Sequence, residues 1–107
     1  MLKSVFYCKY KLKKRTSVED FLSASKQLND EYISKQKGYI SWEQWNDGDI
    51  WVDILTFKSM EDVKSFEENS AANPNEFSLN FYSYINMPSC KVRYYSVERA
   101  YGSADNK

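Results

Sequence analysis

Hydrophobic and polar residues along this chain follow two different periods, which divide it into strands and helices. Runs rich in Val, Ile, Phe, Tyr and Trp predict strands, because these side chains favour a pleated surface. Four such runs cover Val5–Lys11, Tyr39–Trp45, Ile50–Phe57 and Cys90–Arg99. The segment Asn46-Asp47-Gly48-Asp49 predicts a hairpin turn between the second and third runs, since its glycine supplies the positive φ that such turns need.

Helical spacing of apolar residues fills the segment between the first two strands. Thr16-x-x-Glu19 fits a capping box and predicts the start of a helix. Its predicted core-facing residues are Val18, Phe21, Leu22, the small Ser25, Leu28 and Tyr32. Lys35 and Lys37 are predicted to lie in the last turn of this helix, where positive charge is favourable at the negative end of the helix dipole. Gly38 predicts the end of the helix.

A second helical region follows the third strand. Ser59-x-x-Asp62 is another capping box, and Asn73-Pro74-Asn75 breaks the helix that it opens. We expect a further short helix over Glu76–Ile85 and a loop at Met87-Pro88-Ser89. The element order is therefore βαββ(α)αβ, which predicts an α+β ferredoxin-like plait with an antiparallel sheet and helices on one face.

The third strand indicates how the open face of that sheet is covered. Ile50, Val52, Ile54 and Thr56 alternate with Trp51, Asp53, Leu55 and Phe57, so both faces are mostly apolar. A sheet with one face in water should instead alternate apolar and polar residues. An exposed apolar face of this size does not suit a monomer, so the sequence predicts a homodimer paired sheet to sheet.

Length and composition limit the class of protein. The 107 residues predict a single domain over residues 1–101, with a flexible tail at 102–107. Lys+Arg and Asp+Glu both number 15, so no basic excess favours nucleic-acid binding. No long apolar stretch predicts a membrane span or a signal peptide, and two cysteines without a C-x-x-C pair suggest reduced thiols in the cytoplasm. The absence of His excludes His-based catalytic triads and His-ligated zinc or haem, and we expect no metal and no cofactor.

Asp53 is the strongest candidate for a functional residue, because it is an acidic residue in the middle of a strand, between Val52 and Ile54. If Asp47-Gly48 is a two-residue turn, Trp42 pairs with Asp53 and Gln44 pairs with Trp51. That face would carry Ile40, Trp42, Gln44, Trp51, Asp53, Leu55 and Phe57. A carboxyl group between tryptophans in an apolar pocket would have a raised pKa and could act as a base. Alternatively, Asp53 forms a salt bridge to a Lys or Arg on a neighbouring strand, or it lies at a solvated edge.

Several other side chains are candidates for ligand binding. The aromatic residues Tyr7, Trp42, Trp51, Tyr94 and Tyr95 could line a pocket for a flat aromatic ligand, or they could pack in the core and the dimer interface. Arg93 could hold a carboxylate or phenolate, or it could form an ordinary ion pair. Tyr82 and Tyr84 could form a lid over the pocket mouth, or they could be ordinary residues of an amphipathic helix. Cys8 is predicted to be a buried free thiol. Cys90 could be a nucleophile with a low pKa, because Lys91 lies beside it.

Four segments together resemble the antibiotic-biosynthesis-monooxygenase-like group of the dimeric α/β barrel superfamily. They are Gly38–Trp42, Asp47-Gly48, Trp51–Ile54 and Phe57–Asp62, and the resemblance extends over about Val5 to Tyr101. It implies a dimer with a pocket between the sheet and the helices of each subunit. The group includes cofactor-independent monooxygenases and haem-degrading enzymes, and the latter use a His that this chain lacks.

Two functions follow as expectations. The first is a cofactor-independent monooxygenase acting on an aromatic or quinol-type molecule, with Asp53 as the base. Trp42, Trp51, Tyr94, Tyr7, Arg93 and Phe57 are its predicted substrate-binding residues. The second is a non-catalytic small-molecule-binding or interaction protein on the same scaffold.

Overall fold

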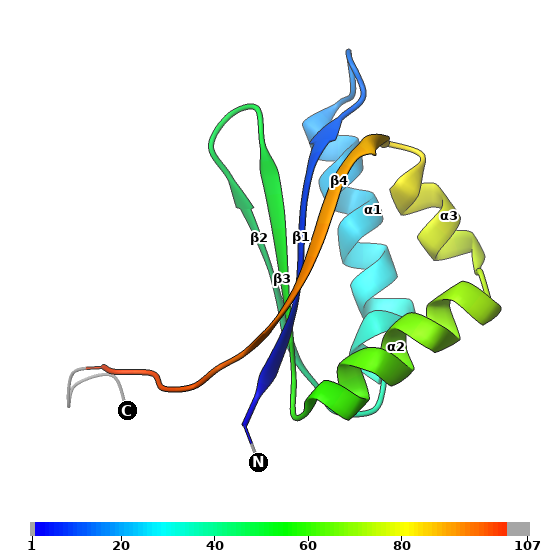
Figure 1. Ribbon diagram of the computed structural model, residues 1–107. Coiled ribbons are helices and arrows are strands. Elements are labelled where there is room, and N and C mark those ends of the chain that lie inside the picture. The colour runs from blue at the N-terminus through cyan, green and yellow to red at the C-terminus, as the bar shows by residue number, and fades with distance from the viewer. Residues whose placement is uncertain (1, 103–107) are drawn as a thin grey trace.

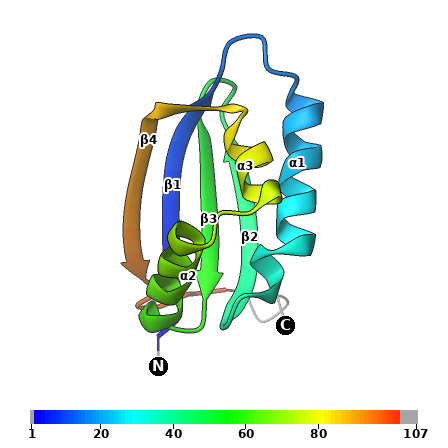
Figure 2. The ribbon, with the colours of Figure 1, turned by 90° about the vertical axis from the view of Figure 1, so that its right-hand side faces the viewer.

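The structure, a computed structural model, describes residues 2–102 as a sheet covered on one face by helices. Its elements are β1 (Ser4–Leu12), α1 (Val18–Glu31), the 3-10 turn η1 (Ile33–Lys35), β2 (Tyr39–Asn46), β3 (Trp51–Phe57), α2 (Met60–Ala72), α3 (Glu76–Tyr82) and β4 (Ile85–Ser96). The four strands form one antiparallel sheet in the order β2-β3-β1-β4 (Figure 1). Figure 2 shows α1, α2 and α3 on the same face of that sheet. The predicted α+β ferredoxin-like fold is confirmed.

The predicted boundary between the domain and its tail stays a prediction, because residues 103–107 lie outside the described part of the chain. Among residues 2–102, no helix combines the length and the apolar character that crossing a bilayer requires.

The helices start at side-chain caps. Ser59 accepts a hydrogen bond from the backbone N–H of Asp62 at 3.2 Å, as its capping box predicts. The cap of α1 is Ser17, which accepts from the N–H of Asp20 at 3.2 Å, so the predicted Thr16 box was wrong by one residue. Both residues are hydroxyl-bearing, and the sequence alone does not separate two neighbouring N-cap candidates.

The end of α1 differs from the prediction. The helix stops at Glu31 and continues as the 3-10 turn Ile33–Lys35, so Lys35 and Lys37 are not in its last turn. Its core face is also rotated slightly, since Val18 and Leu22 are exposed while Ala24 is buried. Gly38 has φ +80° and begins the path into β2.

We expect Gly38→Ala to destabilise the fold by about 2–3 kcal/mol, because it combines positive-φ strain with a clash. A Cβ at this position would overlap the side chain of Asp62. Gly48→Ala is the matched control, because Gly48 also has positive φ but nothing lies within 4 Å of a Cβ built there. Urea denaturation of both variants checks the prediction. Equal losses of unfolding free energy would show that the close approach to Asp62 does not matter.

The β2–β3 hairpin has a longer turn than predicted. Asp47 donates its backbone N–H to the carbonyl of Ile50, and Asn46 pairs with Trp51. Asp53 therefore pairs with Gln44 and not with Trp42. The register moves by two residues, and an even shift leaves every side chain on its predicted face. Ile40 is the exception, because a β-bulge between Tyr39 and Ser41 turns it to solvent.

The last strand begins earlier than predicted. β4 starts at Ile85 and includes Met87-Pro88-Ser89, which we expected to be a loop, and it ends at Ser96 instead of Arg99. A β-bulge in β4 accommodates Pro88. Lys9 pairs with Lys91 and Lys11 pairs with Asn86, so β4 has more residues than β1 between these two pairs. The backbone N–H of Lys11 donates to Ser89 Oγ at 2.9 Å. The predicted helix over Glu76–Ile85 correspondingly ends at Tyr82.

An aromatic core joins the sheet to the helices. The Phe21 ring lies 5.1 Å from Trp51 and 5.4 Å from Phe81, and the Phe57 ring lies 5.3 Å from Phe66. This core fills the space beneath α1 and the start of α2. The break at Asn73-Pro74-Asn75 ends α2 and leads into α3. A cavity remains between α2 and α3 on one side and the strands β1 and β4 on the other.

Candidate functional site

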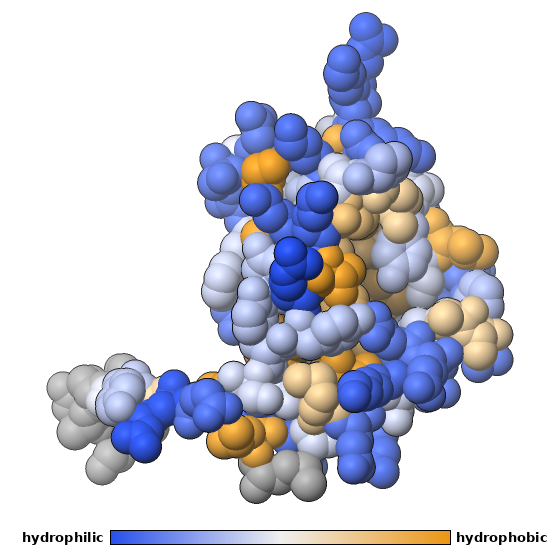
Figure 3. Space-filling model, viewed as in Figure 1, coloured by the Kyte–Doolittle hydropathy of each residue, from blue (hydrophilic) through white to orange (hydrophobic). Residues whose placement is uncertain are grey.

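A cavity of about 460 Å³ lies between the sheet and the helices. Figure 3 shows apolar side chains around this hollow, on the side of the molecule where β4 is the edge strand. The strands contribute Phe6, Cys8, Tyr10, Trp42, Asp53, Leu55, Ile85, Met87, Cys90 and Val92. The helices and turns contribute Leu28, Ile33, Phe66, Glu67, Ser70, Ala71, Pro74, Ser78, Leu79, Phe81 and Tyr82. This volume suits a small organic molecule.

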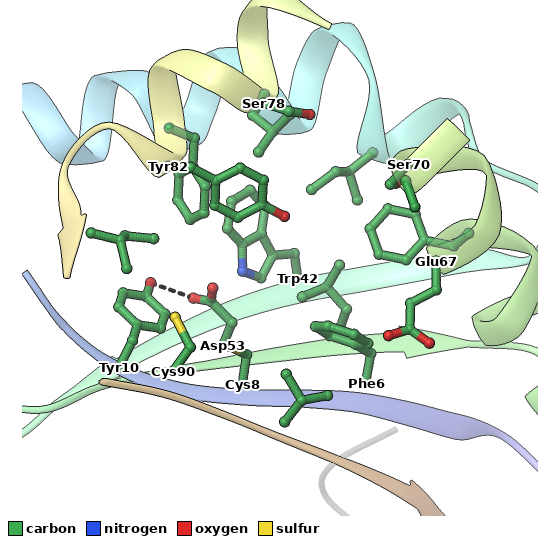
Figure 4. A pocket seen from close by; sticks show the side chains of 18 of the residues that line it. Phe6, Cys8, Tyr10, Trp42, Asp53, Glu67, Ser70, Ser78, Tyr82 and Cys90 are labelled. Carbon is green, nitrogen blue, oxygen red and sulfur yellow. Dashed lines mark hydrogen bonds between the residues drawn. The ribbon is translucent and has the colours of Figure 1, made fainter. Parts of the chain in front are cut away.

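Asp53 projects from the middle of β3 into this cavity and is only 5% exposed. Tyr10, on the adjacent strand β1, donates its hydroxyl proton to Asp53 Oδ1 at 2.9 Å (Figure 4). In the described part of the chain, no Lys or Arg forms an ion pair with Asp53. The two alternatives to a pocket carboxyl, a salt bridge and a solvated edge, do not match this environment.

Burial raises the pKa of the Asp53 carboxyl from 3.8 to about 7. The polar side chains of Tyr10, Trp42 and Gln44 oppose that rise by stabilising the carboxylate. Burial, together with the neighbouring Asp53, also raises the pKa of Tyr10. Tyr10 therefore stays a hydrogen-bond donor at neutral pH. Asp53 exchanges its proton near pH 7, which is where a general base works best.

This raised pKa has a consequence for stability. A carboxyl whose pKa is higher in the folded protein stabilises the fold below pH 4, and the contribution is lost as the pH rises to about 7. The loss corresponds to about 4 kcal/mol at most. Asp53→Asn keeps an acceptor for Tyr10 but cannot ionise. We expect the variant to be more stable than the wild type at pH 8 and to match it only below pH 4. Thermal unfolding at several pH values across this range measures the difference in stability. Asp49→Asn, at an exposed position, is the control. If the stability of wild type and of Asp53→Asn changed with pH in the same way, the prediction would be contradicted.

Trp42 forms part of the cavity wall beside Asp53. Its indole nitrogen faces the Asp53 side of the cavity in Figure 4. The nitrogen is inaccessible to solvent, and it is not in hydrogen-bond geometry with any partner in the described part of the chain. Its N–H instead lies toward the Asp53 carboxyl, and Trp42 lowers the pKa of that carboxyl by stabilising its ionised form.

The two thiols also line the cavity, on the neighbouring strands β1 and β4. Burial raises the pKa of Cys8 to about 12, and it raises the pKa of Cys90 as well. The low-pKa nucleophile considered at Cys90 is therefore contradicted, because burial outweighs any influence of Lys91. No cluster of three or more Cys, Asp or Glu residues within 2–102 is arranged to hold a metal ion.

The structure brings only some of the predicted site residues together. Asp53 and Trp42 line the cavity. Trp51 and Phe57 share their face of the sheet but are 7% and 0% exposed in the aromatic core, away from the cavity. Tyr94 lies near the end of β4, where its hydroxyl donates to Glu67.

Tyr7 and Arg93 lie on the opposite face of the sheet, paired with each other across β1 and β4. The Tyr7 ring packs against Tyr95, with centroids 5.9 Å apart. Arg93 donates to the backbone carbonyl of its neighbour Val92 at 2.9 Å. The period-two alternation of these strands separates both residues from the cavity.

Helix residues supply a wall that the sequence did not predict. Glu67 and Ser70 on α2 and Ser78 on α3 line the cavity, and none of them was a candidate. Tyr82 also lines it and is 45% exposed. Its position over the cavity in Figure 4 suits the lid considered for it. Tyr84 packs instead near Phe21 in the core. The only signal for this wall was the Asn73-Pro74-Asn75 break, which forces the two helices apart.

Comparison with known proteins identifies the fold. No protein-family model and no curated protein matches this chain. Among solved structures, a mutant of SnoaB, a cofactor-independent oxygenase from Streptomyces nogalater, superposes with a TM-score of 0.71. It is 8% identical, and the match covers 94% of this chain and 97% of the SnoaB chain.

Two further structures agree. A monooxygenase from the gene ActVA-Orf6 of Streptomyces coelicolor, in complex with nanaomycin D, gives a TM-score of 0.71 at 15% identity, covering 96% of this chain and 94% of its own. The chain has the fold of the antibiotic-biosynthesis-monooxygenase-like group. A dimeric ferredoxin-like protein from an uncultured marine organism also matches with a TM-score of 0.71, at 12% identity, over 94% of this chain and 100% of its own. At these identities the likeness establishes the fold, which is the one that the sequence resemblance implied.

Proposed function

We propose that this protein is a small homodimeric oxygenase that needs no cofactor and acts on a flat hydroxyarene. The observation that carries the proposal is Asp53, a carboxyl group with a pKa of about 7 in an otherwise largely apolar cavity. Such a group can take the proton of a weakly acidic aromatic hydroxyl. The fold shared with a cofactor-independent oxygenase and with a monooxygenase that binds an aromatic ligand supports this chemistry.

The proposed reaction uses dioxygen as the only oxidant. Asp53 removes the hydroxyl proton, and the resulting arenolate passes one electron to O₂. Recombination of the two radicals forms a C–O bond at the ring carbon para to the oxygen. Asp53 gives its proton to the peroxide formed in this way and then, as a carboxylate, removes the proton on that carbon, which breaks the O–O bond, leaves a quinone carbonyl and expels hydroxide. The departing hydroxide takes the proton held by Asp53 and becomes water, so one arenol and one O₂ give one quinone and one H₂O.

The residues around Asp53 would serve this reaction in distinct ways. Tyr10 holds the carboxylate in place through its hydrogen bond. Trp42 and Gln44 favour the ionised form of the same carboxylate, which is the form that acts as a base. The apolar walls exclude water, which strengthens both interactions.

Incubation of the purified protein with 1-naphthol under ¹⁸O₂ tests the proposal. We expect 1,4-naphthoquinone that contains one ¹⁸O atom, with one O₂ consumed per product. Saturable binding of 1-naphthol without oxygen consumption would instead favour the non-catalytic binding protein. Absence of both binding and turnover would overturn the assignment of a hydroxyarene site.

The proposed homodimer pairs through the sheet face that carries no helices. Val5, Tyr7, Val52, Ile54 and Thr56 on this face are only half-buried in a single chain. Trp45 and Tyr95 flank them and are 53% and 52% exposed. The chain after β4 also runs outward on this side (Figure 1), and its Tyr101 is 85% exposed. A second copy would cover these apolar groups, as the dimeric ferredoxin-like proteins of the same fold suggest.

A further inference from the structure

The charges around the cavity are all of one sign. Asp53 and Glu67 are its only ionisable carboxyl groups, and none of the described lining residues is Lys or Arg. They lie on opposite walls, because Asp53 comes from the sheet and Glu67 comes from α2 (Figure 4). An anionic ligand would therefore lose its hydration without gaining a cationic partner.

The basic residues of the neighbouring strands point away from the cavity. On β1, Cys8 and Tyr10 face inward, so Lys9 and Lys11 between and beyond them face outward. Lys9 pairs with Lys91, and Arg93 lies on the same outer face. Lys9, Lys91 and Arg93 therefore lie on the outer face of the sheet, and the arginine that could have bound a substrate carboxylate does not reach the cavity.

Glu67 is held at its place on the helix wall. It is half-buried and accepts a hydrogen bond from the hydroxyl of Tyr94. This bond and burial raise the pKa of Tyr94 to about 12, so the tyrosine remains a donor throughout the neutral range. Lys64, the nearest cation on the same helix, lines a separate shallow depression with Glu67, Met60 and Tyr94 and not the cavity. Within the described residues, Lys64 does not form an ion pair with Glu67.

We infer that the cavity selects uncharged hydroxyarenes against their carboxylated counterparts, and that Glu67 is the specificity-determining residue. This inference rests on the proposed function, since it concerns the substrate class of the same site. A neutral arenol can give its proton to Asp53 and brings no charge of its own into the cavity. A carboxylate on the same ring system would meet the negative charge of Glu67 in an apolar surrounding, where screening by salt is weak.

A pair of ligands matched in shape tests the inference. Methyl 6-hydroxy-2-naphthoate and 6-hydroxy-2-naphthoate differ in charge but share the ring and the hydroxyl group. Isothermal titration calorimetry at pH 6 should show at least tenfold tighter binding of the ester to the wild-type protein. Glu67→Gln keeps an oxygen that can accept from Tyr94 but removes the charge, and it should lower this preference at least threefold, through stronger binding of the carboxylate.

Glu68→Gln is the control, because Glu68 is exposed on the same helix and does not line the cavity. It removes the same charge and should leave the preference unchanged. Glu67→Lys should reverse the preference and provides a second variant. Equal affinity of the two ligands for the wild type would overturn the inference and leave the proposed function standing. An effect of Glu68→Gln equal to that of Glu67→Gln would likewise overturn the role of Glu67. Failure of both ligands to bind would overturn the proposed function together with the inference.

Discussion

Asp53→Asn should reduce turnover of 1-naphthol at least 100-fold, within the range of about 10²–10⁴ that general-base catalysis contributes. The substitution preserves the volume of the side chain and an acceptor for Tyr10, but an amide cannot take the substrate proton. Affinity for the neutral ligand should change little, because the cavity walls remain. The loss is therefore expected in kcat and not in KM.

The pH dependence of the wild-type enzyme provides a second measure of the same residue. Only the ionised carboxylate is a base, so turnover should rise with pH and level off above about 7. Asp49→Asn, in the exposed β2–β3 turn, is the matched control and should retain wild-type turnover. Undiminished turnover by Asp53→Asn would show that another group, or dioxygen chemistry without a base, performs the reaction.

Ile54→Glu should convert the proposed dimer into a monomer. Ile54 lies near the centre of the outer face, between Glu43 on β2 and Tyr7 on β1 in the strand pairing. Two copies related by a two-fold axis would each bury a carboxylate against apolar neighbours, with Glu43 nearby to add repulsion. A cost on the order of 4 kcal/mol would weaken the dimer about a thousandfold.

Sedimentation velocity at micromolar concentration checks this prediction. The wild type should sediment at twice the 12.7 kDa of one chain, and Ile54→Glu should sediment as a single chain. Gln27→Glu adds the same charge at an exposed position of α1, on the helix side of the sheet, and should remain dimeric. A monomeric wild type would contradict the pairing of the outer faces.

The face of the sheet on which Asp53 lies could be predicted, because it depends only on the alternation of side chains along the strand. The turn length in the β2–β3 hairpin was wrong by two residues, yet Asp53, Trp42 and Gln44 still share a face, since side chains in a strand alternate with a period of two. The same alternation, applied to β1 and β4, would have placed Tyr7 and Arg93 on the outer face once the pairing of β1 with β3 and of β4 with β1 was known. A list of candidate residues without the register could not make that separation.

The rest of the site depends on features that the sequence does not encode locally. Trp51 lies on the same face as Asp53, but the Phe21 ring of α1 packs against it, and the Phe81 ring of α3 stacks on Phe21. Glu67 reaches the cavity only because of how α2 packs over β1 and β3. The bulge in β4 is also non-local, because it depends on Ser89 bonding to Lys11 on another strand.

The ionisation of Asp53 tests the central claim most directly. The side-chain carboxyl carbon of Asp53 can be followed by NMR in protein labelled with ¹³C, from pH 4 to pH 9, and assigned by comparison with Asp53→Asn. The account predicts a single titration with its midpoint near pH 7, well above the ordinary aspartate value of 3.8. A midpoint near pH 4 would contradict it, because a carboxyl group that is already ionised throughout the neutral range is neither desolvated in an apolar cavity nor suited to take the proton of a hydroxyarene.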